Sequence, residues 1–90
     1  MKYRKKPVII EAFKYEGYLI GCIPQAPPWA IQAWREGTLY YSKDGEKLFV
    51  KTLEGDHLVT IGDYIIKGVK DELYACKPDI FEMTYEKVED

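Results

Sequence analysis

The feature that most constrains this chain is an alternation of apolar and polar side chains across residues 38–77, broken at short intervals by glycine beside an acidic residue. A period of two places successive side chains on opposite faces of a β-strand. Asp44-Gly45 between two such runs is typical of a β-hairpin, and Gly55-Asp56 and Gly62-Asp63 indicate further turns. We therefore expect an antiparallel meander of about five short strands in this region.

The flanking segments predict further elements. Alternation from Lys6 to Tyr15 predicts an N-terminal strand, and Met83 to Val88 predicts a last strand near it. Pro78 cannot donate to a strand ladder, so "KPDIFE" predicts a single helical turn or corner, with Asp79 bonding the backbone amides that follow. The predicted fold is α+β: a curved, mostly antiparallel sheet of about five to seven short strands with one short α-helix.

That helix is predicted from Trp29 to Glu36. Pro28 suits the first helical turn and Gly37 suits the C-terminal cap. Trp29 and Trp34 are five residues apart, which is about 140° around a helix axis, so we expect one of them at a margin or an interface.

Length and composition predict a single domain spanning residues 1–90, because 90 residues of which 47% are hydrophobic supply one modest core. A domain this small often gains stability by self-association, and the eight tyrosines suit interfaces, so we expect a homo-oligomer.

A net charge of -2 does not favour nucleic acid as a partner. Basic residues gather at the start of the chain and acidic residues at the end, so the termini are expected to attract each other. The lysines and arginine in question are Lys2, Arg4, Lys5 and Lys6, and the acidic residues are Glu82, Glu86, Glu89 and Asp90.

No apolar run approaches the roughly eighteen residues of a membrane span. We therefore expect a cytoplasmic location and no membrane partner. Cys22 and Cys76 lack the spacing of a metal or redox motif, and we expect both to be reduced and dispensable. With His57 as the single histidine, the chain offers no histidine-rich metal site and no paired-histidine chemistry. Asp63 is interpreted as a turn residue, and we expect neither an enzyme nor a bound cofactor.

Two lysines interrupt apolar rows in the segment after Gly62. Alternation places Lys67 on a face with Ile65, and Lys77 on a face with Leu73. One interpretation is that both lie at the sheet margin, with buried stems and hydrated ammonium groups. The other is an anion site, in which Lys67, Lys77 and Arg35 bind phosphate and a flat ring from Trp34, Tyr74 or Tyr64 stacks on a base.

Three stretches, "MKYRKKPVIIEAFKY", "PPWAIQAWREGTLYYS" and "GDYIIKGVKDELYACKPDIFEMTYE", together resemble a family of small proteins encoded by tailed phages and prophages. The C-terminal pattern is the specific part. This chain departs from it at Asp71, where glycine is usual, and at Ala75, where proline is common. The resemblance implies a phage accessory protein acting in the cytoplasm of a host bacterium.

By analogy of size and setting, such a protein can be a sponge that sequesters a nucleotide signal of bacterial immunity, such as a cyclic dinucleotide or a cyclic ADP-ribose. The ligand-binding residues would then be Lys67, Lys77, Tyr74, Arg35, Trp34 and Tyr64. The alternative is an accessory protein that binds a host or phage protein through an aromatic-rich surface and takes no small molecule. A nucleotide pocket can lie within one chain or between two.

Overall fold

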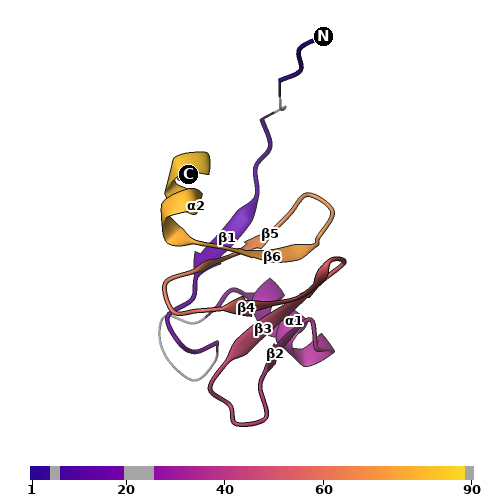
Figure 1. The fold of residues 1–90 in the computed structure, drawn as a ribbon, viewed down its shortest axis with the longest axis vertical. Coiled ribbons are helices and arrows are strands. Elements are labelled where there is room, and N and C mark those ends of the chain that lie inside the picture. Colours follow the sequence, from indigo (N-terminus) through magenta and orange to yellow (C-terminus); the bar gives the residue numbers. More distant parts are fainter. Residues whose placement is uncertain (5–6, 20–25, 89–90) are drawn as a thin grey trace.

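The computed structural model describes residues 1–4, 7–19 and 26–88, and it has the predicted α+β class (Figure 1). Within these residues it contains two helices and six strands, and the strands form two antiparallel sheets of three. In chain order the elements are β1 (Glu11–Lys14), α1 (Pro28–Glu36), β2 (Leu39–Tyr41), β3 (Leu48–Thr52), β4 (Gly55–Val59), β5 (Tyr64–Lys67), β6 (Leu73–Cys76) and α2 (Pro78–Thr84). Neither helix is long and apolar enough to cross a membrane.

The strands divide where one continuous sheet was expected. β2, β3 and β4 form a meander, and the other sheet has the order β1-β5-β6 (Figure 1). The division falls at residues 60–63, where the chain turns through Gly62 at a φ of 97°, a conformation that glycine adopts without strain. After this turn β5 pairs with β1 instead of with β4, because the end of β1 is bonded to the turn itself. Tyr15 donates its backbone N–H to the Asp63 carbonyl, and Gly62 donates to the Tyr15 carbonyl.

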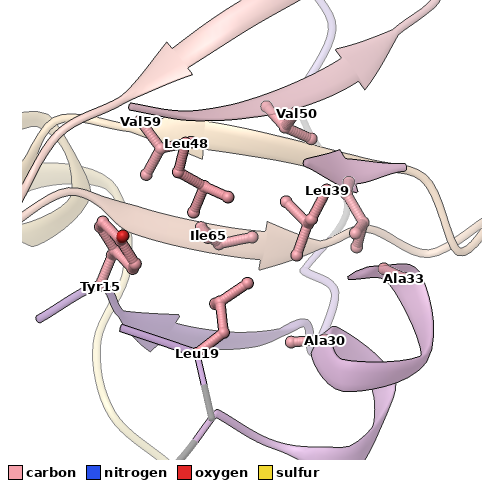
Figure 2. Packing of buried hydrophobic residues seen from close by; sticks show 10 residues of the cluster. Tyr15, Leu19, Ala30, Ala33, Leu39, Leu48, Val50, Val59 and Ile65 are labelled. Carbon is pink, nitrogen blue, oxygen red and sulfur yellow. The ribbon is translucent and has the colours of Figure 1, made fainter. Parts of the chain in front are cut away.

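One apolar core lies between the two sheets (Figure 2). The meander contributes the inward side chains that alternation predicts, and the second sheet contributes Ile65, which is fully buried. Helix α1 adds Ala30 and Ala33, and its small side chains let the helix backbone approach the sheet. Figure 2 also labels Tyr15, Leu19, Leu39, Leu48, Val50 and Val59, and the cluster further includes Leu73.

Helix α1 agrees with its sequence prediction to within one residue. It begins at Pro28 and ends before Gly37, which has the left-handed φ of 86° expected of a glycine cap. Trp29 packs edge-on against Phe13 with 5.5 Å between ring centroids, whereas Trp34 is exposed. The prediction that one tryptophan lies at a margin is confirmed.

The predicted last strand from Met83 to Val88 is wrong. Pro78 starts α2, which continues to Thr84, and residues 85–88 form no strand. Phe81 lies in the helix and Tyr85 directly follows it, and their rings contact each other and the rings of the second sheet. This packing outweighs the short alternation that suggested a strand. Asp79 lies exposed in the first turn, and no described hydrogen bond of its side chain caps the helix.

The N-terminal strand is shorter than the prediction from Lys6 to Tyr15. It begins at Glu11 because its partner Lys67 is the last residue of β5, and Gly68 then starts a turn closed by its N–H bond to the Glu72 carbonyl. Residues 7–10 therefore have no strand partner in the described part of the chain. Figure 1 shows them continuing β1 away from the body of the protein.

The packing of the core predicts that two isoleucine substitutions change the stability by very different amounts. Replacing Ile65 with alanine should lower the free energy of unfolding by about 2 to 5 kcal/mol, because it leaves a cavity between the sheets. Ile61→Ala is the matched control, since Ile61 is 72% exposed, and it should change the value by less than about 0.5 kcal/mol. Urea denaturation measures both. A loss below about 1 kcal/mol for Ile65→Ala would contradict the shared core.

Candidate functional site

The two predicted lysines lie at opposite ends of the β5-β6 hairpin. The register pairs Lys67 with Leu73 near the turn, and pairs Tyr64 with Cys76 at the other end, just before Lys77. Four residues of strand separate the two positions, a distance of about 13 Å. Each ammonium group pairs with carboxylates at its own end of the hairpin, Lys67 with Glu11 and Asp71 and Lys77 with Asp63, so the structure does not bring them into a single anion site.

Lys67 is paired within the chain. Its Nζ atom lies 3.7 Å from Glu11 and 3.5 Å from Asp71, and its side chain is 29% exposed. Glu11 faces Lys67 across the β1-β5 pair, and Asp71 follows it by four residues. The interpretation of Lys67 as a cation at the sheet margin therefore has a specific geometry, in which two carboxylates balance its charge.

A cavity of about 220 Å³ opens beside Lys67, between α1 and the β5-β6 hairpin. Trp29 and Gln32 come from the same helix face, and Glu36 lies one turn further on. The remaining lining residues are Ala33, Thr38, Lys67, Asp71 and Leu73. Of the six predicted ligand-binding residues, only Lys67 lines this cavity. The helical spacing of positions 29, 32, 33 and 36 was the sequence signal that could have identified the others.

The charge around the cavity is negative overall. Glu36 and Asp71 line it with one lysine, and Glu11 is the second partner of that lysine. Carboxylates near an ammonium group compete with an incoming phosphate for it. The cavity therefore suits a neutral or partly cationic group better than a phosphate.

Asp71 has a backbone conformation that is typical of glycine. It has a φ of 64° and is the described non-glycine residue with a left-handed backbone. Glycine adopts this conformation without strain, and aspartate is among the side chains that tolerate it. Here Asp71 supplies a carboxylate that pairs with Lys67.

Lys77 is held by a buried carboxylate. Its Nζ atom lies 3.2 Å from Oδ2 of Asp63, whose side chain is only 4% exposed, and 3.1 Å from Oγ1 of Thr60. Asp63 Oδ2 also accepts hydrogen bonds from the backbone N–H and the hydroxyl of Thr60. The prediction that Asp63 is a turn residue is confirmed, and the turn is closed further by Lys77 from the end of β6.

Tyr64 and Tyr74 lie on the face of the second sheet that α2 covers. The Tyr64 ring stacks on Phe81 with 3.9 Å between centroids and 5° between planes. The Tyr74 hydroxyl is 3.3 Å from that of Tyr85, and burial raises the pKa of Tyr74 above its usual value. Stacking on α2 occupies a face of the Tyr64 ring that a base would need. The pairing register places both tyrosines on the sheet face opposite Lys67.

Trp34 and Arg35 lie apart from these groups, on the exposed side of α1. Together, the six predicted residues occupy four places: the cavity, the Asp63 turn, the α2 face and the outside of α1. They do not converge on one site in a single chain.

The described residues bring together no group of three His, Cys, Asp or Glu side chains that could hold a metal. Cys76 is a free thiol, and burial raises its pKa above the usual value, which lowers its thiolate fraction at neutral pH. It lies in β6, whereas His57 is exposed in β4 of the other sheet. Cys22 lies outside the described residues.

The outer face of β2-β3-β4 is a feature that the site prediction missed. The register places Tyr40, Phe49 and Leu58 side by side across the three strands, on the side opposite the core. The Tyr40 and Phe49 rings are stacked, with 5.4 Å between centroids, and Leu58 is 46% exposed. The described helices pack elsewhere, because α1 enters the core and α2 covers the other sheet. We name Tyr40, Phe49 and Leu58 the aromatic face.

Polar groups border the aromatic face. Tyr40 donates its hydroxyl to Asp56, and this hydrogen bond raises the pKa of Tyr40. Lys51 places its Nζ atom 5.5 Å from the centre of the Tyr40 ring. The alternation in "TLYYS" and "KLFVKTL" was the signal for this face, since the outward residues of a solvated sheet should be polar, and Tyr40 and Phe49 at such positions are aromatic.

No protein-family model matches the chain, and neither the curated proteins nor the solved structures contain a significant match to it.

The contacts around Asp63 predict unequal losses of stability when Asp63 and Lys77 are replaced. Asp63→Ala should lower the free energy of unfolding by about 2 to 3 kcal/mol, because it leaves the Thr60 N–H without its acceptor. Lys77→Met should cost about 1 kcal/mol or less, since water can reach the half-exposed ammonium site. The double variant should lose little more than Asp63→Ala alone.

Chemical denaturation measures these values, and Lys70→Met, at an exposed lysine of the same hairpin, is the control. If the two single losses were small and simply additive, Asp63 and Lys77 would not form the stabilising pair described here.

Proposed function

We propose that this chain is a non-enzymatic binding protein that contacts a partner protein through its aromatic face. The observation that carries the proposal is the contrast between the two sheets. The outer face of β1-β5-β6 is covered by α2, whereas that of β2-β3-β4 presents an apolar row to solvent. The resemblance to small phage-encoded proteins supports a role as an accessory factor whose partner is a host or phage protein.

The chemistry of the aromatic face suits protein recognition. A tyrosine held against a second ring is a rigid, amphipathic contact residue that loses little conformational entropy on binding. The neighbouring Leu58 offers an aliphatic surface, so the partner should present apolar side chains of its own. Lys51 and Asp56 at the border carry opposite charges and can pair with a mixed polar rim.

A photo-crosslinking residue placed at position 58 tests this proposal. In bacteria that contain the partner, it should give a discrete adduct with one protein, identified by mass spectrometry. The matched control is the same residue at position 53, in the exposed turn between β3 and β4 of the same sheet, which should give no such adduct. Adding Tyr40→Ala should reduce the adduct about tenfold or more, because truncating a central aromatic contact weakens binding by that amount.

Adducts that form equally at positions 53 and 58 would contradict the proposal. An adduct at position 58 that contained only a second copy of this chain would also contradict it, because the face would then be an oligomer interface.

A second candidate is the capture of a nucleotide signal. The carboxylates around the cavity beside Lys67 disfavour a phosphate there, but the cavity also contains groups that a nucleotide can use. It combines one lysine with Trp29, an aromatic side chain of a kind on which a base can stack. Its volume of about 220 Å³ is below the roughly 300 to 1,000 Å³ of typical ligand pockets. A whole cyclic dinucleotide would therefore extend beyond this cavity and require contacts from a second chain.

Calorimetry against cyclic dinucleotides and cyclic ADP-ribose isomers tests this second candidate. If a nucleotide binds in the cavity, Lys67→Ala should weaken binding about tenfold to a hundredfold, the effect of one lost charge-assisted contact. Lys70→Ala is the control in the same hairpin, because Lys70 does not line the cavity. Absence of binding to the unmodified protein would exclude these nucleotides as ligands, and equal affinity of both variants would exclude Lys67 as the contact.

A further inference from the structure

Strand β1 has a free edge. Within the described residues it pairs only with β5, and it is the outer strand of its sheet. Residues 7–10 extend the same edge beyond the body of the protein, and Ile9 is 79% exposed (Figure 1). An edge strand with exposed apolar side chains is a template for pairing with another strand.

The direction of the backbone groups along this edge follows from one observed pair. Tyr15 makes its hydrogen bonds to the Asp63 carbonyl and the Gly62 N–H, so its backbone groups point toward β5. In an antiparallel pair these groups alternate, and the N–H and C=O groups of Ala12 and Lys14 therefore point away from β5. Continued alternation places Val8 and Ile10 on the same free edge.

The proline in this segment does not interrupt the edge. Pro7 has no N–H to donate, but it falls at an odd-numbered position, on the side of the strand away from the free edge. The four outward positions from Val8 to Lys14 all keep their donors. The segment from Val8 to Lys14 is thus able to form an uninterrupted ladder with a strand of another chain.

We propose that two copies of this protein pair through β1 and residues 8–10, joining their β1-β5-β6 sheets into one sheet of six strands. A two-fold interface uses the same surface on both copies, which makes the two β1 strands antiparallel. This proposal concerns a different surface from the aromatic face and does not depend on it.

Charge supports a second copy as the occupant. Strands β1 and β6 both run antiparallel to β5, so α2 begins at the Lys14 end of the sheet. In the antiparallel pair, the N-terminal segment of the partner runs toward this end. Its exposed Lys2 and Arg4 then approach exposed carboxylates of α2, Asp79 and Glu82, so a basic segment meets an acidic one.

Sedimentation equilibrium on the full chain tests the proposal. The unmodified protein should show a concentration-dependent dimer that weakens as salt increases. Ile10→Pro removes an outward N–H and should weaken the dimer about tenfold, whereas Ile9→Pro removes an N–H on the other side of the strand and should have a smaller effect. Both positions precede the hydrogen-bonded part of β1, and circular dichroism should show that both variants stay folded.

Charge reversal provides an independent test. The variant Lys2→Glu with Arg4→Glu, and the variant Asp79→Lys with Glu82→Lys, should each dimerise less well than the unmodified protein. Mixed together they should form a heterodimer, because each N-terminal segment then meets an α2 of opposite charge.

A monomer at all concentrations, or a dimer equally sensitive to Ile9→Pro and Ile10→Pro, would overturn the proposal. So would a mixture of the two charge variants that stays monomeric. Leu58→Glu should leave the dimer intact, and its loss in that variant would assign self-association to the aromatic face instead. A monomeric protein that still gives the adduct at position 58 would refute only the pairing through β1.

Discussion

The structure depends on one apolar core that neither sheet can form alone. Three short strands bury little surface by themselves, and stability comes when the inner faces of β2-β3-β4 and β1-β5-β6 enclose Leu39, Val50 and Ile65 with the small residues of α1. Because the core uses one face of each sheet, two outer faces remain. Helix α2 covers one with Phe81 and Tyr85, and the aromatic face is the other. The proposed binding surfaces are the parts of the sheets that no other described residues cover.

The buried carboxylate of Asp63 helps to fix how the two sheets meet. Asp63 is the buried charged side chain of the described residues, and it lies where the chain passes from one sheet to the other. Its backbone holds the end of β1 through Tyr15, and its carboxylate holds Thr60 and Lys77. Hydrogen bonds from Thr60 compensate for most of the hydration that this buried carboxylate loses, and the partly exposed Lys77 adds a smaller contribution. The lysines that suggested an anion site in the sequence are accounted for in this way, as partners of the chain's own carboxylates.

Local patterns predicted much of the fold and little of the site. Alternation and turn residues gave the α+β class and the hairpins, and proline and glycine gave α1, because these signals act over a few residues. The last strand was wrong because the contact of Phe81 with Tyr64 is not local, and the division into two sheets depends on Asp63 meeting residues far along the chain. The predicted ligand residues share suitable chemistry, but only the register shows that Lys67 and Tyr74 lie on opposite faces.

We propose that the surfaces left open by the core are used for binding, and the free edge of β1 offers the most direct test. Amide hydrogen exchange, followed by NMR in concentrated solution, distinguishes the two sides of this strand. The N–H groups of Ala12 and Lys14 should be protected from exchange, as that of Phe13 is, and their protection should fall on dilution. Rapid exchange of Ala12 and Lys14 at every concentration, beside a protected Phe13, would contradict this proposal.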